Sequence, residues 1–525
     1  VPMSPTHRSI AYLLALLAGP PLSNLGWSQS PDLVVSQVAT NNGWTYYGQT
    51  GGLAAYSFRN TTCNLGNLPL DWSPVVVENL YLVRNGHIEQ VAASFGLHKV
   101  CAVNETGCGT CQPTGCSTLG IGCGDTSAIH DGASGWARWQ INGNTGTWSG
   151  TPVGPCCEPA PLAGRVFAPI ADLTDPSLRV VAEAQFVSAH DQSFGNGANN
   201  ASWTAVQVAI PSNPQNLGST HIGEPAIFAW QTEHPDVQLE ALVLLDEGGP
   251  GYHGFLWLGS RATDLGGGLW RYDHAVQNLT CERAIGSLTI HSPCPQPVAS
   301  TVEFRGAPQH SGSPYASTPW AFANTAGDLT WSTEPYASDP DANALRWGTL
   351  MSCSFESTSL PSQGSIDLGL FQPGVVNSLS ANGWVPTNAG FEYPSYCTAL
   401  PTTLGSPIDL QGSGTPVIAA ANLHLSATSV PPNNFGYFLM GNGQLFTPLP
   451  PGSQGNLCLG GSIYRFHSNI LNSGPFGAVA FQPRPTALPP GAVWSAGDTW
   501  NFQYWTRDWP GLSNFSNVAS ITFCE

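Results

Sequence analysis

Short segments in which apolar and polar residues alternate recur along this chain. In residues 498–509 (DTWNFQYWTRDW), three aromatic residues fall on one face: Trp500, Phe502 and Tyr504. Polar residues fall mostly on the other face: Asn501, Gln503 and Arg507. Residues 423–427 (LHLSA) and 520–523 (SITF) alternate in the same way. Because successive side chains of a β-strand point to opposite faces, this period of two residues predicts strands.

Residues 75–84 (VVVENLYLVR) predict a further strand that ends in a tight turn. Asn85 and Gly86 follow this apolar segment directly. Both central positions of a two-residue hairpin favour positive φ, which Asn and Gly adopt readily. No segment predicts a long helix, and residues 228–245 predict one short helix followed by a strand.

The composition supports an all-β fold. Only 9% of the residues are charged, Lys99 is the single lysine in 525 residues, and Gly (59) and Pro (45) are abundant. Long amphipathic helices need many Lys, Glu, Arg and Ala residues on their solvent-facing side, which this composition does not supply. We therefore predict an all-β protein of two or more β-sandwich-like domains, with long Gly/Pro/Ser-rich loops and disulfide bonds.

The charge balance excludes two classes of partner. The formal net charge is -18 at pH 7, and basic residues do not cluster along the sequence. Nucleic acids and anionic membrane surfaces both attract clustered Lys or Arg side chains. We therefore expect neither a nucleic-acid partner nor binding to an anionic membrane surface. The acidity by itself does not identify any other partner.

An export signal is predicted near the start of the chain. A basic pair (His7 and Arg8) follows Met3, an apolar core occupies residues 10–18 (IAYLLALLA), and a Gly-Pro-Pro breaker begins at Gly19. This core is shorter than the ~20 residues of a membrane-spanning helix, and no later apolar segment reaches that length. Residues 1–30 are interpreted as the signal peptide of a secreted or cell-surface protein without a membrane span after signal removal. The alternative is a buried helix of a cytosolic protein, which fourteen cysteines disfavour.

Cysteines are concentrated in one short segment. Five of the fourteen lie close together: Cys101, Cys108, Cys111, Cys116 and Cys123. The last four could hold a structural metal, because Cys108 and Cys111 have the spacing of a zinc knuckle. Disulfide bonds are the favoured interpretation, because exported thiols meet oxidising conditions.

The other cysteines suggest how the bridges divide. Three of them, Cys63, Cys156 and Cys157, complete an even set of eight that could close as four bridges. Cys281 and Cys294 form a candidate local pair. The remaining disulfide candidates are Cys353, Cys397, Cys458 and Cys524.

One main domain boundary is predicted. A Gly/Ser/Asn/Pro-rich passage precedes a renewed run of short strands, and we place a linker there at residues 376–394. It separates a β-rich main region, residues 31–375, from a C-terminal β-sandwich module, residues 395–525. The main region contains the cysteine-rich segment 101–157.

Several motifs make this chain similar to a known group of proteins. They are residues 56–72 (YSFRNTTCNLGNLPLDW), 108–123 (CGTCQPTGCSTLGIGC), 343–349 (NALRWGT), 433–441 (NNFGYFLMG), 456–466 (NLCLGGSIYRF) and 497–508 (GDTWNFQYWTRD). With them the chain resembles large secreted, cysteine-containing proteins of planctomycete-type bacteria, mostly uncharacterised, which share a recurrent C-terminal β-rich module. The resemblance implies export and a β-rich build, and it implies no activity. The chain departs from that group where Thr126 and Ser127 follow Asp125, in place of an Asp-Pro-Tyr run.

Catalytic motifs are absent from the sequence. It contains no Gly-x-Ser-x-Gly elbow, no His-Glu-x-x-His pair and no phosphate loop with Lys. One Gly-x-Gly-x-x-Gly spacing begins at Gly249, but a strand pattern follows it where a nucleotide site needs a helix, so we interpret it as a turn. The sequence therefore favours a non-enzymatic protein.

Two groups of residues are candidate metal ligands. The first could gather a copper or zinc ion from separate strands: His221, Glu224, His253 and His310. The second has the first ligand positions of a calcium loop: Asp339, Asp341 and Asn343. Ala344 stands where that loop needs glycine, so a plain turn is the favoured interpretation. No cofactor is required, and calcium or a transition metal stays a candidate.

Tryptophans provide the remaining functional indication. Exposed indole rings stack on sugar faces, and the candidates are Trp136, Trp139, Trp505 and Trp509. Core packing is the alternative role for each of them. We therefore favour an exported surface or extracellular protein of structural, adhesive or ligand-binding type, with polysaccharide or other cell-surface components as partners. The alternative is an extracellular carbohydrate-active enzyme or lectin, with or without a bound metal.

Overall fold

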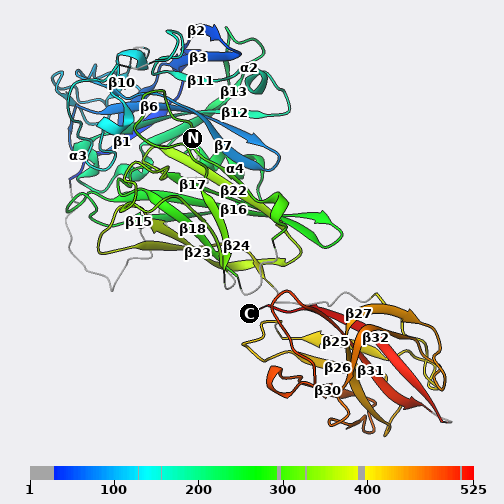
Figure 1. Ribbon diagram of the computed structural model, residues 1–525. Helices are drawn as coiled ribbons and strands as arrows, with labels where there is room; N and C mark the ends of the chain where they lie inside the picture. Colours follow the sequence, from blue (N-terminus) through cyan, green and yellow to red (C-terminus); the bar gives the residue numbers. More distant parts are fainter. Residues whose placement is uncertain are drawn as a thin grey trace.

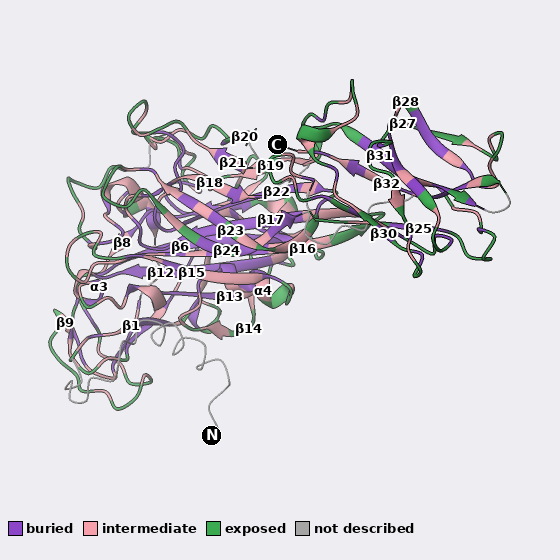
Figure 2. Cartoon of the chain, turned by 90° about the horizontal axis from the view of Figure 1, so that it is seen from below, coloured by how far each residue is buried: buried purple, intermediate pink, exposed green. Residues whose placement is uncertain are grey.

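The computed structural model describes residues 29–127, 129, 131–154, 157–292, 297–325, 328–387, 396–414, 416–508 and 511–524. Strands dominate the regular structure of this part of the chain; buried residues concentrate along them, while exposed residues lie mainly in loops and turns and on outer strands (Figure 2). The predicted signal peptide, residues 1–30, lies almost wholly outside the described residues. Within the described part, no helix is long and apolar enough to span a membrane.

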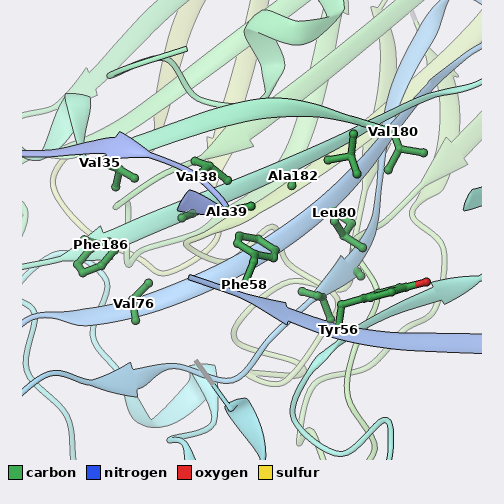
Figure 3. Close-up of a cluster of buried hydrophobic side chains, with 14 of the residues drawn as sticks. Val35, Val38, Ala39, Tyr56, Phe58, Val76, Leu80, Val180, Ala182 and Phe186 are labelled. Carbon is green, nitrogen blue, oxygen red and sulfur yellow. The ribbon is translucent and has the colours of Figure 1, made fainter. Parts of the chain in front are cut away.

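The first sandwich packs a six-stranded sheet against two smaller sheets. The large sheet contains β14 (Gln215–His221), β13 (Ala201–Gln207), β12 (Arg179–Val187), β6 (Val75–Arg84) and β7 (His87–Ala93), with β8 (Leu97–His98) beside β6. One small sheet contains β1 (Leu33–Gln37), β4 (Thr61–Asn64) and β10 (Gly124–Thr126). The other contains β11 (Val166–Pro169), β3 (Leu53–Phe58) and β2 (Trp44–Thr50). Tyr56 and Phe58 of β3 pack against Leu80 of β6 and Val180 of β12, which makes one core between the layers (Figure 3).

The second sandwich consists of two five-stranded sheets. The first contains β15 (Gln238–Leu244), β16 (Gly254–Gly266), β17 (Leu269–Asn278), β22 (Thr349–Ser357) and β19 (Glu303–Arg305). The second contains β20 (Ala321–Thr325), β21 (Asp328–Ser332), β18 (Ile285–His291), β23 (Leu360–Leu370) and β24 (Ser378–Thr387). Apolar side chains from both sheets, among them Tyr272, Trp331 and Phe355, fill the space between them.

The two sandwiches are stacked on each other through a layer that mixes apolar and polar side chains. Trp203 and Trp230 pack there against Ala275 of β17 and Leu350 of β22. Glu183 of β12 is fully buried in the same layer. Its carboxylate accepts hydrogen bonds from the Tyr81 hydroxyl (2.7 Å), Asn79 Nδ2 (2.8 Å), Gln277 Nε2 (2.7 Å) and the Ala226 backbone N–H (2.6 Å). A buried carboxylate is tolerated because donors surround it.

The C-terminal module is a third sandwich with its own core (Figure 1). One sheet contains β28 (Leu457–Arg465), β27 (Phe435–Thr447), β31 (Thr499–Asp508) and β32 (Leu512–Thr522), with β29 (Leu471–Asn472) beside β27. The other contains β25 (Asp409–Ser413), β26 (His424–Thr428) and β30 (Val479–Phe481). Its core draws only on residues from Ile408 to Phe523. The predicted all-β architecture of several β-sandwich-like domains is confirmed.

The helices in the described part of the chain are short, as predicted. They are α2 (Ile170–Leu173), α3 (Ala189–Gln192) and α4 (Ile227–Glu233), with 3-10 turns at η1 (Thr40–Asn42), η2 (Gly132–Ser134), η3 (Arg138–Gln140), η4 (Gly197–Asn199), η5 (Ala299–Thr301) and η6 (Pro485–Ala487). The prediction of one short helix and a strand in residues 228–245 is confirmed by α4 and β15. The predicted hairpin is confirmed too, because Arg84 pairs with His87 and the turn residues Asn85 and Gly86 have φ of 48° and 86°.

Disulfide bonds link four pairs of described cysteines: Cys63–Cys108, Cys101–Cys116, Cys111–Cys123 and Cys397–Cys458. The first bond ties residue 108 to β4, which carries Cys63, and the next two close loops within residues 101–123. Within this segment β9 (Thr118–Leu119) pairs with β5 (Leu70–Asp71). The zinc-knuckle alternative is wrong, because all four of its sulfur atoms are used in these bonds. Cys157 and Cys524 are also disulfide-bonded, whereas Cys156 and Cys294 lie outside the described residues.

Two cysteines that were predicted to form bridges are free. Cys281 and Cys353 are buried thiols. Cys353 lies on β22 and packs into the core of the second sandwich, where a thiol acts as a small apolar side chain. The Cys281 sulfur lies 3.5 Å from Glu247 Oε1. Burial raises the pKa of both thiols, so each stays protonated.

The predicted linker is partly wrong. Residues 378–387, which fall within the predicted 376–394, form β24 and pair along β23. Ala381 and Val385 point into the core of the second sandwich. The Gly, Ser and Asn residues that suggested a linker lie mainly on the other face of this strand or at its turns, where they need no apolar partner. Residues 388–395 lie outside the described part of the chain.

Candidate functional site

A groove with a volume of about 540 Å³ lies where the first sandwich meets the turn between β15 and β16 of the second, and residues 146–148 of the cysteine-rich segment form part of its wall. Its walls come from four segments that are distant in sequence. The side chains that matter for binding are Asp71, Ser73, Trp148, Ser188, His190 and Tyr252. Pockets for organic ligands usually enclose about 300–1,000 Å³, so this groove is large enough for a ligand.

Trp148 is presented by a tight loop. The backbone N–H of Asn142 donates to Thr147 O (2.7 Å), and the Asn142 side chain accepts hydrogen bonds from the next turn of the loop. The half-buried indole of Trp148 packs on the rings of Trp136 (6.1 Å between centroids) and His98 (4.2 Å). Because neighbouring rings hold it, Trp148 can offer an aromatic surface to the groove without losing much side-chain freedom on binding.

His190 and Asp71 meet on another wall. His190 Nδ1 accepts a hydrogen bond from the Asp71 backbone N–H (3.0 Å), so the neutral ring carries its proton on Nε2. The Asp71 side chain is 76% exposed. Helix α3, which carries His190, is anchored by the buried carboxyl of Asp191, which accepts from Leu33 N–H (2.8 Å) and Asn200 Nδ2 (2.7 Å). Burial raises the pKa of Asp191 to about 7.

Hydroxyl groups complete the lining. Ser73 Oγ lies 2.8 Å from His98 Nε2, and burial lowers the pKa of His98. The buried Ser188 hydroxyl has no hydrogen-bond partner among the described residues. Tyr252 enters from the turn between β15 and β16, where its backbone N–H donates to Gly249 O (3.0 Å). The groove therefore combines aromatic surfaces with mostly uncharged hydrogen-bonding groups.

This combination suits sugar binding better than sugar hydrolysis. Asp71 is the one carboxylate among the described residues that line the groove. Glycoside hydrolysis usually needs two carboxyl groups on either side of the scissile bond. Aromatic rings and neutral donors and acceptors, by contrast, are what a polyhydroxylated ligand requires.

A second cavity, lined by Glu282, Arg346, His310, Tyr315 and Trp139, is much smaller, at about 40 Å³. It has room for a few water molecules at most. Arg346 stacks on the Tyr315 ring at 3.9 Å, and burial raises the pKa of Glu282 to about 7. Its charged side chains make it a buried polar site rather than a ligand pocket.

The structure does not bring the predicted copper or zinc ligands together. His221 and Glu224 form one pair, with Nδ1 and Oε2 3.3 Å apart. His253 Nδ1 instead accepts from the Asp246 backbone N–H (3.0 Å). His310 is buried between Glu158 (2.9 Å) and Ala93 O (2.6 Å). Among the residues that the structure describes, no three His, Cys, Asp or Glu side chains are placed to hold a metal ion.

The predicted calcium ligands form a turn. Asp339 Oδ1 accepts a hydrogen bond from the Asp341 backbone N–H (3.0 Å). Asn343 is turned into the protein, where its Nδ2 donates to Thr318 O (2.8 Å). The side-chain oxygen of Asp339 therefore stabilises its own loop, as in the turn that the sequence favoured.

The four predicted sugar-binding tryptophans have different environments. Trp136 supports Trp148 from behind, and Trp139 lines the small cavity. Trp505 lines a groove in the C-terminal module, and Trp509 lies outside the described residues. Sequence reasoning missed His190 and Tyr252 as partners of Trp148. No spacing signal could have found them, because they come from separate elements of the first and second sandwiches.

Comparison with known proteins identifies no family. No family model matches the chain, and no curated protein matches it. Among solved structures, the chain is similar to an exo-β-N-acetylglucosaminidase of family GH20 from Vibrio harveyi, with 12% identity and a TM-score of 0.15 over 38% of this chain and 24% of that chain. It spans about a quarter of the length of that enzyme.

Two further solved structures are similar at the same low level. One is BcpA, the major pilin subunit of Bacillus cereus, with 8% identity and a TM-score of 0.17 over 72% of this chain and 88% of that chain. The other is the BSP domain of a biofilm-associated protein, with 7% identity and a TM-score of 0.13 over 96% of this chain and 84% of that chain. Similarities this weak carry no functional argument.

Proposed function

We propose that this protein is an exported, disulfide-stabilised surface or extracellular protein that binds polysaccharide in the groove at Trp148. The compartment is supported by the predicted signal peptide and by the four disulfide bonds that join described cysteines, because such bonds persist in oxidising environments. The resemblance to secreted proteins of planctomycete-type bacteria supports the same assignment.

The groove itself carries the functional part of the proposal. It places Trp148 and Tyr252 beside the hydroxyl of Ser73, the free side of His190 and the exposed carboxylate of Asp71. A sugar ring has an apolar C–H face and an equatorial rim of hydroxyl groups. The rings suit the face, and the polar groups suit the rim.

Binding to neutral polysaccharides tests this proposal. The mature protein, residues 31–525, is screened on a glycan array, and the best oligosaccharide is titrated by calorimetry. Trp148→Ala is expected to weaken binding about tenfold or more, because the loss of one stacked ring removes roughly 1.5 kcal/mol.

The matched control is Phe476→Ala, which removes an aromatic side chain that is 93% exposed on the C-terminal module, outside the groove. This variant is expected to bind like the wild type. If Trp148→Ala keeps wild-type affinity while its thermal unfolding is unchanged, the groove is not the binding site. If no glycan binds, the proposed function is wrong.

A further inference from the structure

A second groove lies on the C-terminal module and has a volume of about 530 Å³. Its described lining comes from the end of β31, from residues 511–513 at the start of β32, and from Asn434 and Gly452. The side chains relevant to binding are Asn434, Trp505, Arg507, Asp508 and Leu512. Its size is close to that of the groove at Trp148.

Neighbouring side chains fix the ring of Trp505 in this groove. It pairs with Tyr437 across β31 and β27, and the two ring centroids lie 4.8 Å apart. Beneath them is a small core that contains Phe515 and the Cys397–Cys458 disulfide. The indole is only half-buried, so one part of it stays available to a ligand.

The two charged residues of the groove, Asp508 and Arg507, differ in whether neighbouring groups bind their charge. Asp508 is buried, and its carboxylate accepts hydrogen bonds from Thr403 N–H (3.0 Å), the Thr403 hydroxyl and Gln454 Nε2. Arg507 is exposed and forms no ion pair within the described part of the chain. The groove therefore presents one available cation next to an aromatic ring.

The charge of the whole module agrees with an anionic ligand. Residues 395–525 contain three arginines, three aspartates and one glutamate, so they carry only -1 of the formal charge of -18. The rest of the chain repels anions at long range. The C-terminal module is thus the part of the protein where an acidic chain can approach most easily.

We propose that this groove binds an acidic polysaccharide, with a uronate carboxylate paired to Arg507 and the sugar ring stacked on Trp505. A guanidinium pairs with a carboxylate through two parallel N–H donors, which fixes the orientation of the sugar. The inference concerns a site and a ligand class that are separate from the groove at Trp148. The protein would then hold two kinds of glycan on two different bodies.

Titration of the mature full-length protein with an oligogalacturonate tests this inference. Arg507→Gln and Trp505→Ala are each expected to weaken binding about tenfold, and binding is expected to weaken as salt rises, because an exposed ion pair is screened. Arg507→Lys, which keeps the charge but not the two-donor geometry, is expected to retain part of the affinity.

The matched control is Arg465→Gln, because Arg465 is an exposed arginine on β28 outside the groove. Equal weakening by Arg465→Gln and Arg507→Gln would show only a general charge effect and would overturn the inference. Wild-type affinity in both Arg507→Gln and Trp505→Ala would overturn it too, as would a failure of the uronate to bind. Trp148→Ala is expected to leave uronate binding unchanged, which separates this site from the first groove.

Discussion

Glu282 is half-buried at the wall of the small cavity. Its Oε2 accepts a hydrogen bond from Gly143 N–H (2.9 Å). Burial, opposed by that hydrogen bond and reinforced by the nearby Glu247 charge, raises the pKa of Glu282 to about 7. At pH values between about 4.5 and 7, Glu282 therefore keeps its proton in the folded protein and loses it in the unfolded chain.

This residue is expected to make the protein less stable as the pH rises. The free energy of unfolding falls with pH wherever the folded state binds more protons, so the contribution of Glu282 is lost between about pH 4.5 and 7. Glu282→Gln keeps an acceptor for Gly143 and removes the titration. Urea unfolding from pH 5 to 8 is expected to show a smaller decline in this variant, by on the order of 3 kcal/mol.

Other buried groups set the background for that measurement. Burial raises the pKa of Asp273 to about 6, which acts in the same direction, and lowers the pKa of His274 to about 4, which acts in the opposite direction. The difference between variant and wild type isolates Glu282 from both. Glu334→Gln, at an exposed glutamate, is the control and is expected to keep the wild-type pH profile. An identical profile for Glu282→Gln would refute the assignment.

At the scale of elements, the β6–β7 hairpin is a point of attachment between the two stacked sandwiches. Its turn residue Gly86 accepts a hydrogen bond at its carbonyl from Trp230 Nε1 (2.7 Å) on α4. A Cβ atom at Gly86 would lie 2.6 Å from Arg261 Nη1 on β16. The turn therefore favours glycine for its positive φ, and a Cβ atom there would also displace the end of the Arg261 side chain.

Gly86→Ala is expected to destabilise the protein by about 2 kcal/mol, as strain at positive φ adds to the displacement of Arg261. Gly52→Ala is the matched control. Gly52 has a φ of 80°, close to the 86° of Gly86, but nothing lies within 4 Å of its Cβ position. Denaturant unfolding is expected to show the larger loss for Gly86→Ala. Equal losses would mean that backbone strain explains the whole effect.

At the scale of the whole molecule, the C-terminal module has cores of its own. Its two apolar clusters use residues 397–523, whereas the clusters of the stacked sandwiches use residues 33–385. Cooperative unfolding requires a shared core. We therefore expect calorimetry to resolve two unfolding transitions.

Removal of the Cys397–Cys458 disulfide is expected to affect only one of these transitions. The bond closes a chain segment with a sequence separation of 61, and its loss is expected to destabilise the module by about 2–4 kcal/mol. Cys397→Ser with Cys458→Ser should lower the C-terminal transition and leave the other unchanged, with hydrogen exchange assigning each transition to its residues. A single transition, or a shift of both, would contradict separate unfolding of the C-terminal module.

The local sequence pattern predicted where strands form, but it did not predict which faces of the strands are covered. Trp500, Phe502 and Tyr504 do share one face and lie in the core of the C-terminal module. The opposite face was predicted to be mostly polar, and its residues Asn501 and Gln503 are buried. Gln503 Nε2 donates to Asn456 O (2.9 Å) and Ser516 O (2.8 Å), so burial costs it no hydrogen bonds. Cys397 packs on this face of the sheet, where it is bonded to Cys458 of β28. The two residues are 61 positions apart, so no short sequence window contains this contact.

The sequence by itself determined the all-β class, the short helices, the hairpin turn and the use of disulfide bonds. These depend on side-chain period, on residues that tolerate positive φ and on composition, which are local properties of the chain. Only the tertiary structure decided that Cys281 and Cys353 stay free and that Trp148 shares a groove with His190 and Tyr252. Both outcomes depend on which distant strands pack together, because burial and proximity are properties of the folded chain.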